Sequence, residues 1–212
     1  MRSTDPVPRG ARSVLGMAVA AVLLVAGCSS GNAGSDDPAD IGSAESQELS
    51  TTTLAPTAPF VLTSTAFADG APIPTEHACA AQGGGDVSPP ITWSGLPEGT
   101  TSLALVMDDP DAPAEGGFVH WVVVDIDPAT GGVDAGEAVG RTGVNGAGAA
   151  AYLGPCPPAG PAHSYVFSLF AFVEAPDWPE QPTREDVLAA AGAATNGAIG
   201  SATFTGTFEN AG

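Results

Sequence analysis

The chain has 212 residues, with 24 acidic and five basic side chains and a formal net charge of −19 at pH 7. It contains no lysine, and so few cations cannot neutralise many phosphates, which argues against nucleic acid as a partner. The length predicts one folded domain with tails.

The N-terminus has the features of an export signal. Three arginines precede an apolar run from Val14 to Ala26, which at 13 residues is shorter than the roughly 20 that span a bilayer. The run ends in Val-Ala-Gly-Cys, which resembles the lipobox of bacterial lipoproteins. We predict that residues 1–27 are a signal peptide and that lipid on Cys28 holds the protein on the extracytoplasmic face of the cell membrane. A plain signal peptide and an uncleaved anchor are the alternatives.

The composition of residues 28–59 predicts a disordered acidic tether. This stretch has five acids, no base and no aromatic residue, and it is rich in Ser, Thr, Gly, Ala and Pro. Such a composition buries too little apolar surface to offset the entropy lost on ordering. From Cys28 onward the chain has two bases and 23 acids, a formal charge of −21.

The pattern changes at Phe60, and residues 60–210 predict a folded domain that is mainly β and a sandwich. Apolar and β-branched runs predict strands at 59–67, 91–93, 101–107, 118–126, 163–173 and 201–209. The run at 101–107 is apolar at nearly every position, which predicts burial of both faces. Residues 127–162 are rich in Gly and Pro, which predicts that most of this stretch is a loop. A capping pattern at 183–186 predicts one helix that frays or ends near Asn196.

A stiff acidic turn follows the predicted strand at 101–107. Asp109 and Asp111 lie in the sequence DPDAP, where two prolines restrict the backbone. Carboxylates in such a turn can cap backbone amides, take part in an anion site, or begin a calcium loop. Pro113 stands where a calcium loop needs its third ligand, and the other interpretations stay open.

Two histidines lie in separate predicted strands. Because side chains alternate between the two faces of a strand, His120 is expected on the face of Val122. By the same rule His163 is expected on the face of Tyr165. The histidines can be hydrogen-bonded core residues, anion ligands, or, with Asp109, a two-histidine, one-carboxylate metal site. His77 lies in a predicted turn and is expected to be solvated.

The cysteines and the remaining nucleophiles favour structure over catalysis. If Cys28 carries lipid, Cys79 and Cys156 remain, and an oxidising compartment permits a disulfide between them. Cys156 as a nucleophile is the alternative. Ser164 points to the opposite strand face from His163, so this pair cannot act together, and the chain has no G-x-S-x-G elbow.

Four motifs occur in a distinctive order: DPDAP at 109–113, His-Trp at 120–121, GPCPP at 154–158 and His-x-Tyr at 163–165. With the flanking stretches at 60–80 and 87–100 they resemble the phosphatidylethanolamine-binding proteins, and in particular the bacterial Raf-kinase-inhibitor-like branch. The resemblance runs from about Phe60 to Phe208.

The resemblance implies a Greek-key β-sandwich with a short C-terminal helix and one or two minor helical turns. It also implies a small pocket at one end that takes phosphate, acetate or a phospholipid headgroup without turnover, cofactor or metal. The pocket residues would be Asp109, His120, Gly154, His163 and Tyr165, with Asp111 in a supporting network.

Physical roles can be assigned to these residues. A backbone N–H near Gly154 could approach an anion closely because glycine has no Cβ, and Tyr165 could donate its phenolic proton. We expect Asp109 either to orient His120 or to hold a proton, and so to set which imidazole nitrogen faces the ligand. The alternative function is a protein-interaction module, such as a protease or kinase inhibitor-like regulator, with an unknown partner.

Three departures from the family pattern each remove a hydrogen-bond donor. Ser164 stands where the family usually has arginine, Gly197 where bacterial relatives often have histidine, and Phe208 where many have tyrosine. Together with the charge of −21 from Cys28 onward, these changes favour weak anion binding or a zwitterionic ligand.

Overall fold

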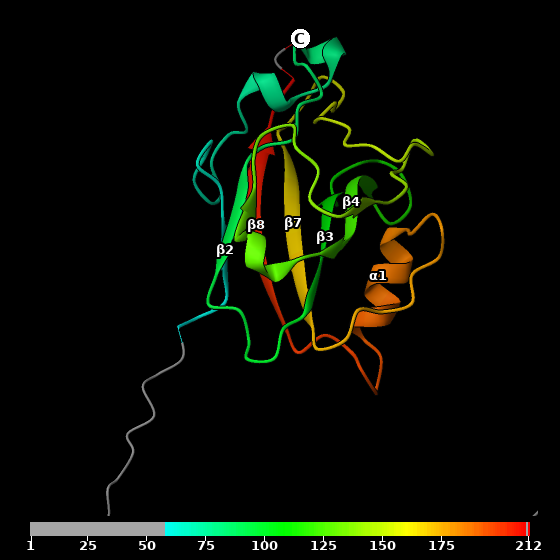
Figure 1. Ribbon diagram of the computed structural model, residues 1–212. Coiled ribbons are helices and arrows are strands. Elements are labelled where there is room, and N and C mark those ends of the chain that lie inside the picture. Colours follow the sequence, from blue (N-terminus) through cyan, green and yellow to red (C-terminus); the bar gives the residue numbers. More distant parts are fainter. Residues whose placement is uncertain (1–57, 211) are drawn as a thin grey trace, which may run out of the picture. The chain divides into compact units, whose positions relative to one another are not determined.

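The computed structural model describes residues 58–210 and 212. The predicted signal peptide, the lipidation of Cys28 and almost all of the predicted tether lie outside these residues. The described part contains two antiparallel sheets and one α-helix (Figure 1).

The smaller sheet has three strands, in the spatial order β1 (Val61–Thr63), β2 (Ile91–Ser94) and β5 (Gly132–Val133). The larger sheet has the order β6 (Arg141–Thr142), β4 (Phe118–Ile126), β3 (Ser102–Asp109), β7 (His163–Phe172) and β8 (Gly200–Phe208). The helix is α1 (Arg184–Ala191), and three 3-10 turns are η1 (Thr75–His77), η2 (Ala80–Gln82) and η3 (Pro128–Thr130).

The mainly β class with one short helix is as predicted, but some details differ. The short strands β5 and β6 fall in the segment predicted as loop, and the 3-10 turns are three, not one or two. The capping box is present, with Thr183 and Asp186 each accepting the other's backbone N–H. The helix ends at Ala191, earlier than predicted, because Gly192 is a poor helix former and its N–H caps the last turn.

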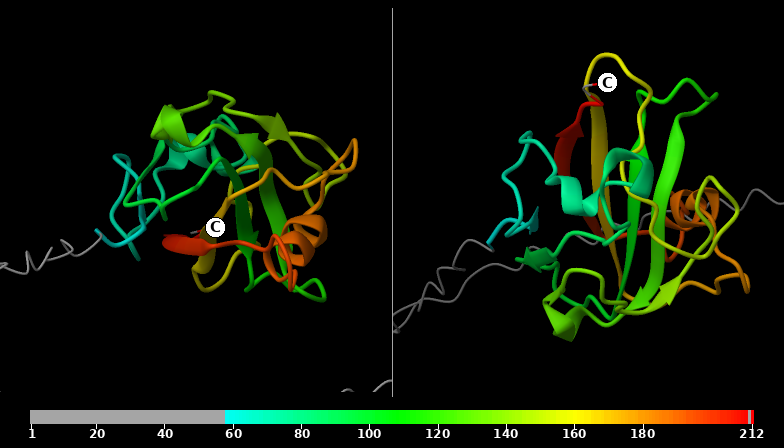
Figure 2. Two further views of the ribbon diagram at one scale, coloured as in Figure 1. Left: turned by 60° about the horizontal axis from the view of Figure 1, so that its bottom comes forward. Right: turned by 90° about the horizontal axis from the view of Figure 1, so that it is seen from above.

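The larger sheet is covered on both faces, as the apolar run at 101–107 predicted. One face of β3 and β7 packs toward the three-stranded sheet in a large core that includes Leu105, Phe167 and Ile91. The other face packs with α1 in a smaller core around Val106 and Val187. Figure 2 shows α1 on one side of β3 and β4 and the three-stranded sheet on the other.

A bulge in β4 changes the face on which His120 lies. The register with β3 slips by one residue at Met107–Asp108, so β4 carries an extra residue there. The side chains of His120 and Trp121 therefore both face the large core, where the His120 ring contacts Tyr165. The prediction that His120 shares a face with Val122 is wrong, because Val122 packs in the smaller core with α1.

The two ends of the sandwich carry different features. At one end β3 finishes, β4 and β7 begin, and β8 finishes, since Asp109 pairs with Phe118 and His163 with Phe208. At the other end β7 finishes and β3 and β8 begin, and Phe60 contacts this end beside Gly200. The chain thus enters the domain at the end opposite the loops that join β3 to β4 and lead into β7 (Figure 1).

Candidate functional site

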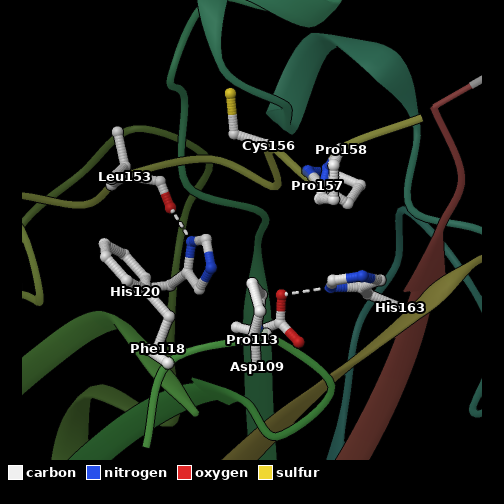
Figure 3. A pocket seen from close by; sticks show the side chains of 11 residues that line it. Asp109, Pro113, Phe118, His120, Leu153, Cys156, Pro157, Pro158 and His163 are labelled. Carbon is white, nitrogen blue, oxygen red and sulfur yellow. Dashed lines mark hydrogen bonds and ion pairs between the residues drawn. The ribbon is translucent and has the colours of Figure 1, made fainter. Parts of the chain in front are cut away.

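A cavity of about 560 Å³ opens at the end of the larger sheet where β3 finishes and β4 and β7 begin. Asp109, His120 and His163 contribute the polar and ionisable side chains of its wall (Figure 3). The other residues of the wall come from two loops and the start of β4: Ala112, Pro113, Ala114, Phe118, Leu153, Cys156, Pro157 and Pro158. The cavity therefore combines a compact polar group with an apolar surround.

Asp109 is the last residue of β3 and is only 3% exposed. Its Oδ2 atom accepts a hydrogen bond from Nδ1 of His163 at 2.8 Å, and its Oδ1 accepts the N–H of Asp111 at 3.0 Å. The expectation that Asp109 orients His120 is wrong: the carboxylate orients His163. Both β4 and β7 lie next to β3, but the Nδ1 atom of His120 is already bonded to the Leu153 carbonyl, and His163 is the partner of Asp109.

His120 is held by a backbone carbonyl. It is 3% exposed, and its Nδ1 lies 2.7 Å from the carbonyl oxygen of Leu153, which can only accept a hydrogen bond, so Nδ1 carries a proton. Burial lowers the pKa of His120 below its ordinary value, against the opposing effects of the Leu153 carbonyl and the Asp109 charge. The ring is therefore neutral near pH 7, and its Nε2 lone pair points toward the middle of the cavity (Figure 3).

Tyr165 lies behind the cavity and not in its wall. It is fully buried in the large core, and its ring meets the His120 ring edge-on with centroids 5.1 Å apart. Burial raises the pKa of Tyr165, and the nearby Asp109 charge raises it further. Its hydroxyl makes no well-formed hydrogen bond within the described part of the chain, although the Asp109 carboxylate and the backbone of Cys156 lie close to it. Tyr165 thus packs against His120 from the core, and its role as a proton donor stays a prediction.

Gly154 itself does not supply the backbone N–H group that is predicted to meet an anion near this position. Its N–H donates to Oδ1 of Asp86 at 2.8 Å and is not directed to a ligand. A Cβ at this position would lie 2.3 Å from the carbonyl carbon of Ala78 and 2.5 Å from the carbonyl oxygen of His77. Glycine is needed here because two backbone segments pack directly against each other.

A disulfide joins the same two segments. Cys79 and Cys156 are bonded, with Cα atoms 5.5 Å apart, as the cysteine arithmetic allowed. Cys156 is part of the cavity wall, so the bridge ties that wall to the turn at residues 75–82.

His77 belongs to this supporting layer, and the expectation that it is solvated is wrong. It is 1% exposed, and its Nδ1 lies 2.8 Å from the carbonyl oxygen of Val87. Its own carbonyl accepts the hydroxyl proton of Tyr152 at 2.8 Å. Sequence reasoning missed Leu153 and Asp86 as well, because a carbonyl acceptor and a distant capping carboxylate leave no local sequence signal.

Asp111 fastens the loop between β3 and β4 to β7, which is the supporting position predicted for it. Its Oδ2 accepts the backbone N–H of Ser164 at 2.7 Å. This hydrogen bond lowers the pKa of Asp111 below its ordinary value. The side chain itself is exposed to solvent.

We expect Asp111→Asn to destabilise the protein near pH 7 and to have little effect in strong acid. The folded-state pKa is lowered, so the stabilisation is complete above the unfolded-state pKa and disappears as the pH falls through the folded-state value. The loss at pH 7 should stay under about 1 kcal/mol because the carboxylate is exposed. Urea unfolding of both proteins from pH 7 to pH 2 tests this, and a difference that grows toward low pH would contradict it.

Residues 58–210 and 212 contain no group of three or more His, Cys, Asp or Glu side chains arranged to hold a metal ion. None of the helices in that range has the length and apolar character needed to cross a bilayer.

The sequence and the fold match a known family. A family model described as phosphatidylethanolamine-binding protein matches residues 63–209, so the chain belongs to the phosphatidylethanolamine-binding protein family. The crystal structure of Escherichia coli YbcL, described as a new member of the mammalian family, superposes with a TM-score of 0.65 at 31% identity. That match covers 72% of this chain and 99% of YbcL.

Particular relatives extend the comparison. A Mycobacterium tuberculosis protein named "Putative lipoprotein LppC" is 41% identical over 196 residues, which cover 90% of this chain and 92% of the relative. The "UPF0098 protein" of Methanothermobacter thermautotrophicus is 40% identical over 132 residues, or 59% of this chain and 84% of the relative. The LppC match therefore extends beyond the residues that the family model matches.

Proposed function

We propose that the protein binds a small oxyanionic or zwitterionic group, such as phosphate or a phospholipid headgroup, in the cavity beside β3, β4 and β7. The observation that carries this proposal is the convergence of Asp109, His120 and His163 in one cavity whose other walls are apolar. Few polar groups fixed in an apolar surround are typical of a site that orients a small ligand. The family description, phosphatidylethanolamine-binding protein, supports the same class of ligand.

The hydrogen bonds of the site determine which protons a ligand must bring. Nδ1 of His120 donates to Leu153 and Nδ1 of His163 donates to Asp109, so both Nε2 atoms are acceptors when the rings are neutral. An oxyanion cannot bond to an acceptor unless a proton lies between them. Binding therefore takes up a proton, either on an imidazole or on the ligand itself, or selects a ligand that carries its own donor, such as an ammonium group.

We further propose binding without turnover. The sulfur of Cys156 is held in the disulfide and is not a free nucleophile. Ser164 follows His163 in β7 and so points to the opposite face of the strand. Asp109 already accepts two hydrogen bonds that fix the loop and His163, which is a positioning role.

The location that we propose is the extracytoplasmic face of the cell membrane, with lipid on Cys28. The lipobox-like sequence supports this, and so does the name of the LppC relative, whose match covers 90% of this chain. The disulfide between Cys79 and Cys156 fits an oxidising compartment.

Phosphate titrations at pH 8, 7 and 6 test the ligand proposal. Monohydrogen phosphate, which prevails at pH 8, brings only one P–OH donor for two acceptor nitrogens, so a further proton should strengthen binding and affinity should rise as the pH falls, by up to about tenfold for each pH unit. Isothermal calorimetry in buffers of different ionisation enthalpy counts the protons directly. His120→Gln should weaken binding and flatten the pH dependence.

The third histidine of the chain supplies the control. His77→Gln removes an imidazole that does not line the cavity, and glutamine can still donate to the Val87 carbonyl, so proton uptake should be unchanged. If phosphate and phosphoethanolamine both fail to bind at every pH, the proposal is wrong. Capture of a specific envelope protein by the same preparation would then favour the protein-interaction module.

A further inference from the structure

We infer that Arg184, on the opposite face of the sheet from the cavity, is a positioning residue that holds the cavity's rim loop in place. The rim loop is defined as residues 110–117, between β3 and β4. It supplies Ala112, Pro113 and Ala114 to the cavity wall. The part of this inference that concerns ligand affinity rests on the proposed function, and the part that concerns the loop does not.

The two halves of the rim loop are held differently. Its first half is fixed by Asp111, which bonds to β7 through Ser164 and to Asp109 through its own N–H. Its second half contains Gly116 and Gly117, both with φ of +79°, a conformation that glycine adopts without strain. Two adjacent glycines stiffen a chain very little, so this half needs an external contact to keep one position.

Arg184 provides that contact. It is the first residue of α1, and its Nη1 donates to the carbonyl oxygen of Gly116 at 3.0 Å and to Oδ1 of Asp108 at 3.3 Å. Its side chain is 20% exposed, and its Nη2 lies 3.0 Å from Oε1 of Glu185. One guanidinium therefore joins the end of β3, the rim loop and the helix.

Asp108 makes the contact specific for a cation. Burial raises the pKa of this carboxyl, and Arg184 acts against that effect through its charge and its hydrogen bond. Asp108 precedes Asp109 in β3, so the two carboxylates point to opposite faces of the sheet, one to Arg184 and one to His163. Displacement of Asp108 would thus move the residue that orients His163.

Arginine suits this position better than lysine. Its planar group presents several N–H donors in fixed directions and can serve a carboxylate and a carbonyl together, whereas an ammonium is a compact point charge. From Cys28 onward the only other basic residue is Arg141. Arg141 bonds to Asp125 at 3.0 Å and to the carbonyl of Pro179, which is the same kind of contact away from the cavity. It is a matched control.

The first experiment measures the loop without a ligand. Amide hydrogen exchange of the full chain should show the Gly117 N–H, which donates to Ala114, exchanging about tenfold faster in Arg184→Gln. Core amides such as that of Leu105 should keep their wild-type rates, which separates local opening from global destabilisation. Arg184→Lys should restore part of the protection, and Arg141→Gln should leave Gly117 unchanged. Equal Gly117 rates in wild type and Arg184→Gln would overturn the inference.

The second experiment measures inorganic phosphate binding by calorimetry. The dissociation constant should rise about fivefold or more in Arg184→Gln, less in Arg184→Lys, and less than about twofold in Arg141→Gln. If the wild type binds no phosphate, the proposed function fails while the exchange experiment still decides the role of Arg184. If the wild type binds and both glutamine variants match it, Arg184 does not position the cavity.

Discussion

Replacing Cys79 and Cys156 together with serine is expected to lower the free energy of unfolding by about 4 kcal/mol. The two residues are 77 positions apart, so the bridge removes a large amount of conformational freedom from the unfolded chain. Cys156 also lies in the cavity wall, so phosphate affinity should fall as well. Urea unfolding of the oxidised wild type and of the double variant measures the first effect, and calorimetry measures the second.

Two controls test whether the loss of stability comes from the disulfide. Cys28→Ser removes a thiol and keeps the disulfide, so its stability should equal that of the wild type. Reduction of the wild type should reproduce the loss seen in the double variant. A loss below about 1 kcal/mol in the double variant would show that the turn at residues 75–82 is held by other contacts.

Gly154→Ala is expected to cost about 3 kcal/mol. The new Cβ would lie 2.3 Å from the carbonyl carbon of Ala78 and 2.6 Å from the backbone nitrogen of Cys79. Backbone atoms cannot rotate away as a side chain can, and the disulfide between Cys79 and Cys156 limits any shift of the two segments. The neighbouring Leu153 carbonyl should move with the loop and weaken its hydrogen bond to His120.

Unfolding experiments and the NMR resonance of the His120 Nδ1 proton test the Gly154 prediction. Gly192→Ala is the control, because its Cβ would lie 3.4 Å from the nearest atom, the Leu188 carbonyl oxygen, and its φ of −87° suits alanine. Its effect should stay within about 0.5 kcal/mol. Equal stabilities of the two alanine variants would show that the loop at Gly154 adjusts freely.

The sequence predicts the strands well where burial determines the pattern. The apolar runs at 101–107, 118–126 and 163–173 become β3, β4 and β7, because a strand covered on both faces is apolar at most of its positions. The bulge in β4 was not predictable from local composition. It depends on how β4 pairs with β3, where Met107 lies opposite Trp121 and Asp108 lies opposite Val119. That single extra residue decides that His120 faces the large core and not α1.

The site was only partly predictable for a similar reason. The motifs identified Asp109, His120 and His163, and the structure brings these three together in one cavity. Which histidine Asp109 would meet depended on the Leu153 carbonyl that holds His120, and the need for glycine at Gly154 depends on backbone around His77, far away in the chain. The identity of the ligand and the absence of turnover stay predictions.

The chain enters the domain at the end of the sandwich opposite the cavity, where Phe60 lies beside Gly200. The tether predicted at residues 28–59 would be flexible, so it would not fix the orientation of a lipid-anchored domain. The same cavity could then meet a guest from the aqueous side or a headgroup of the supporting bilayer.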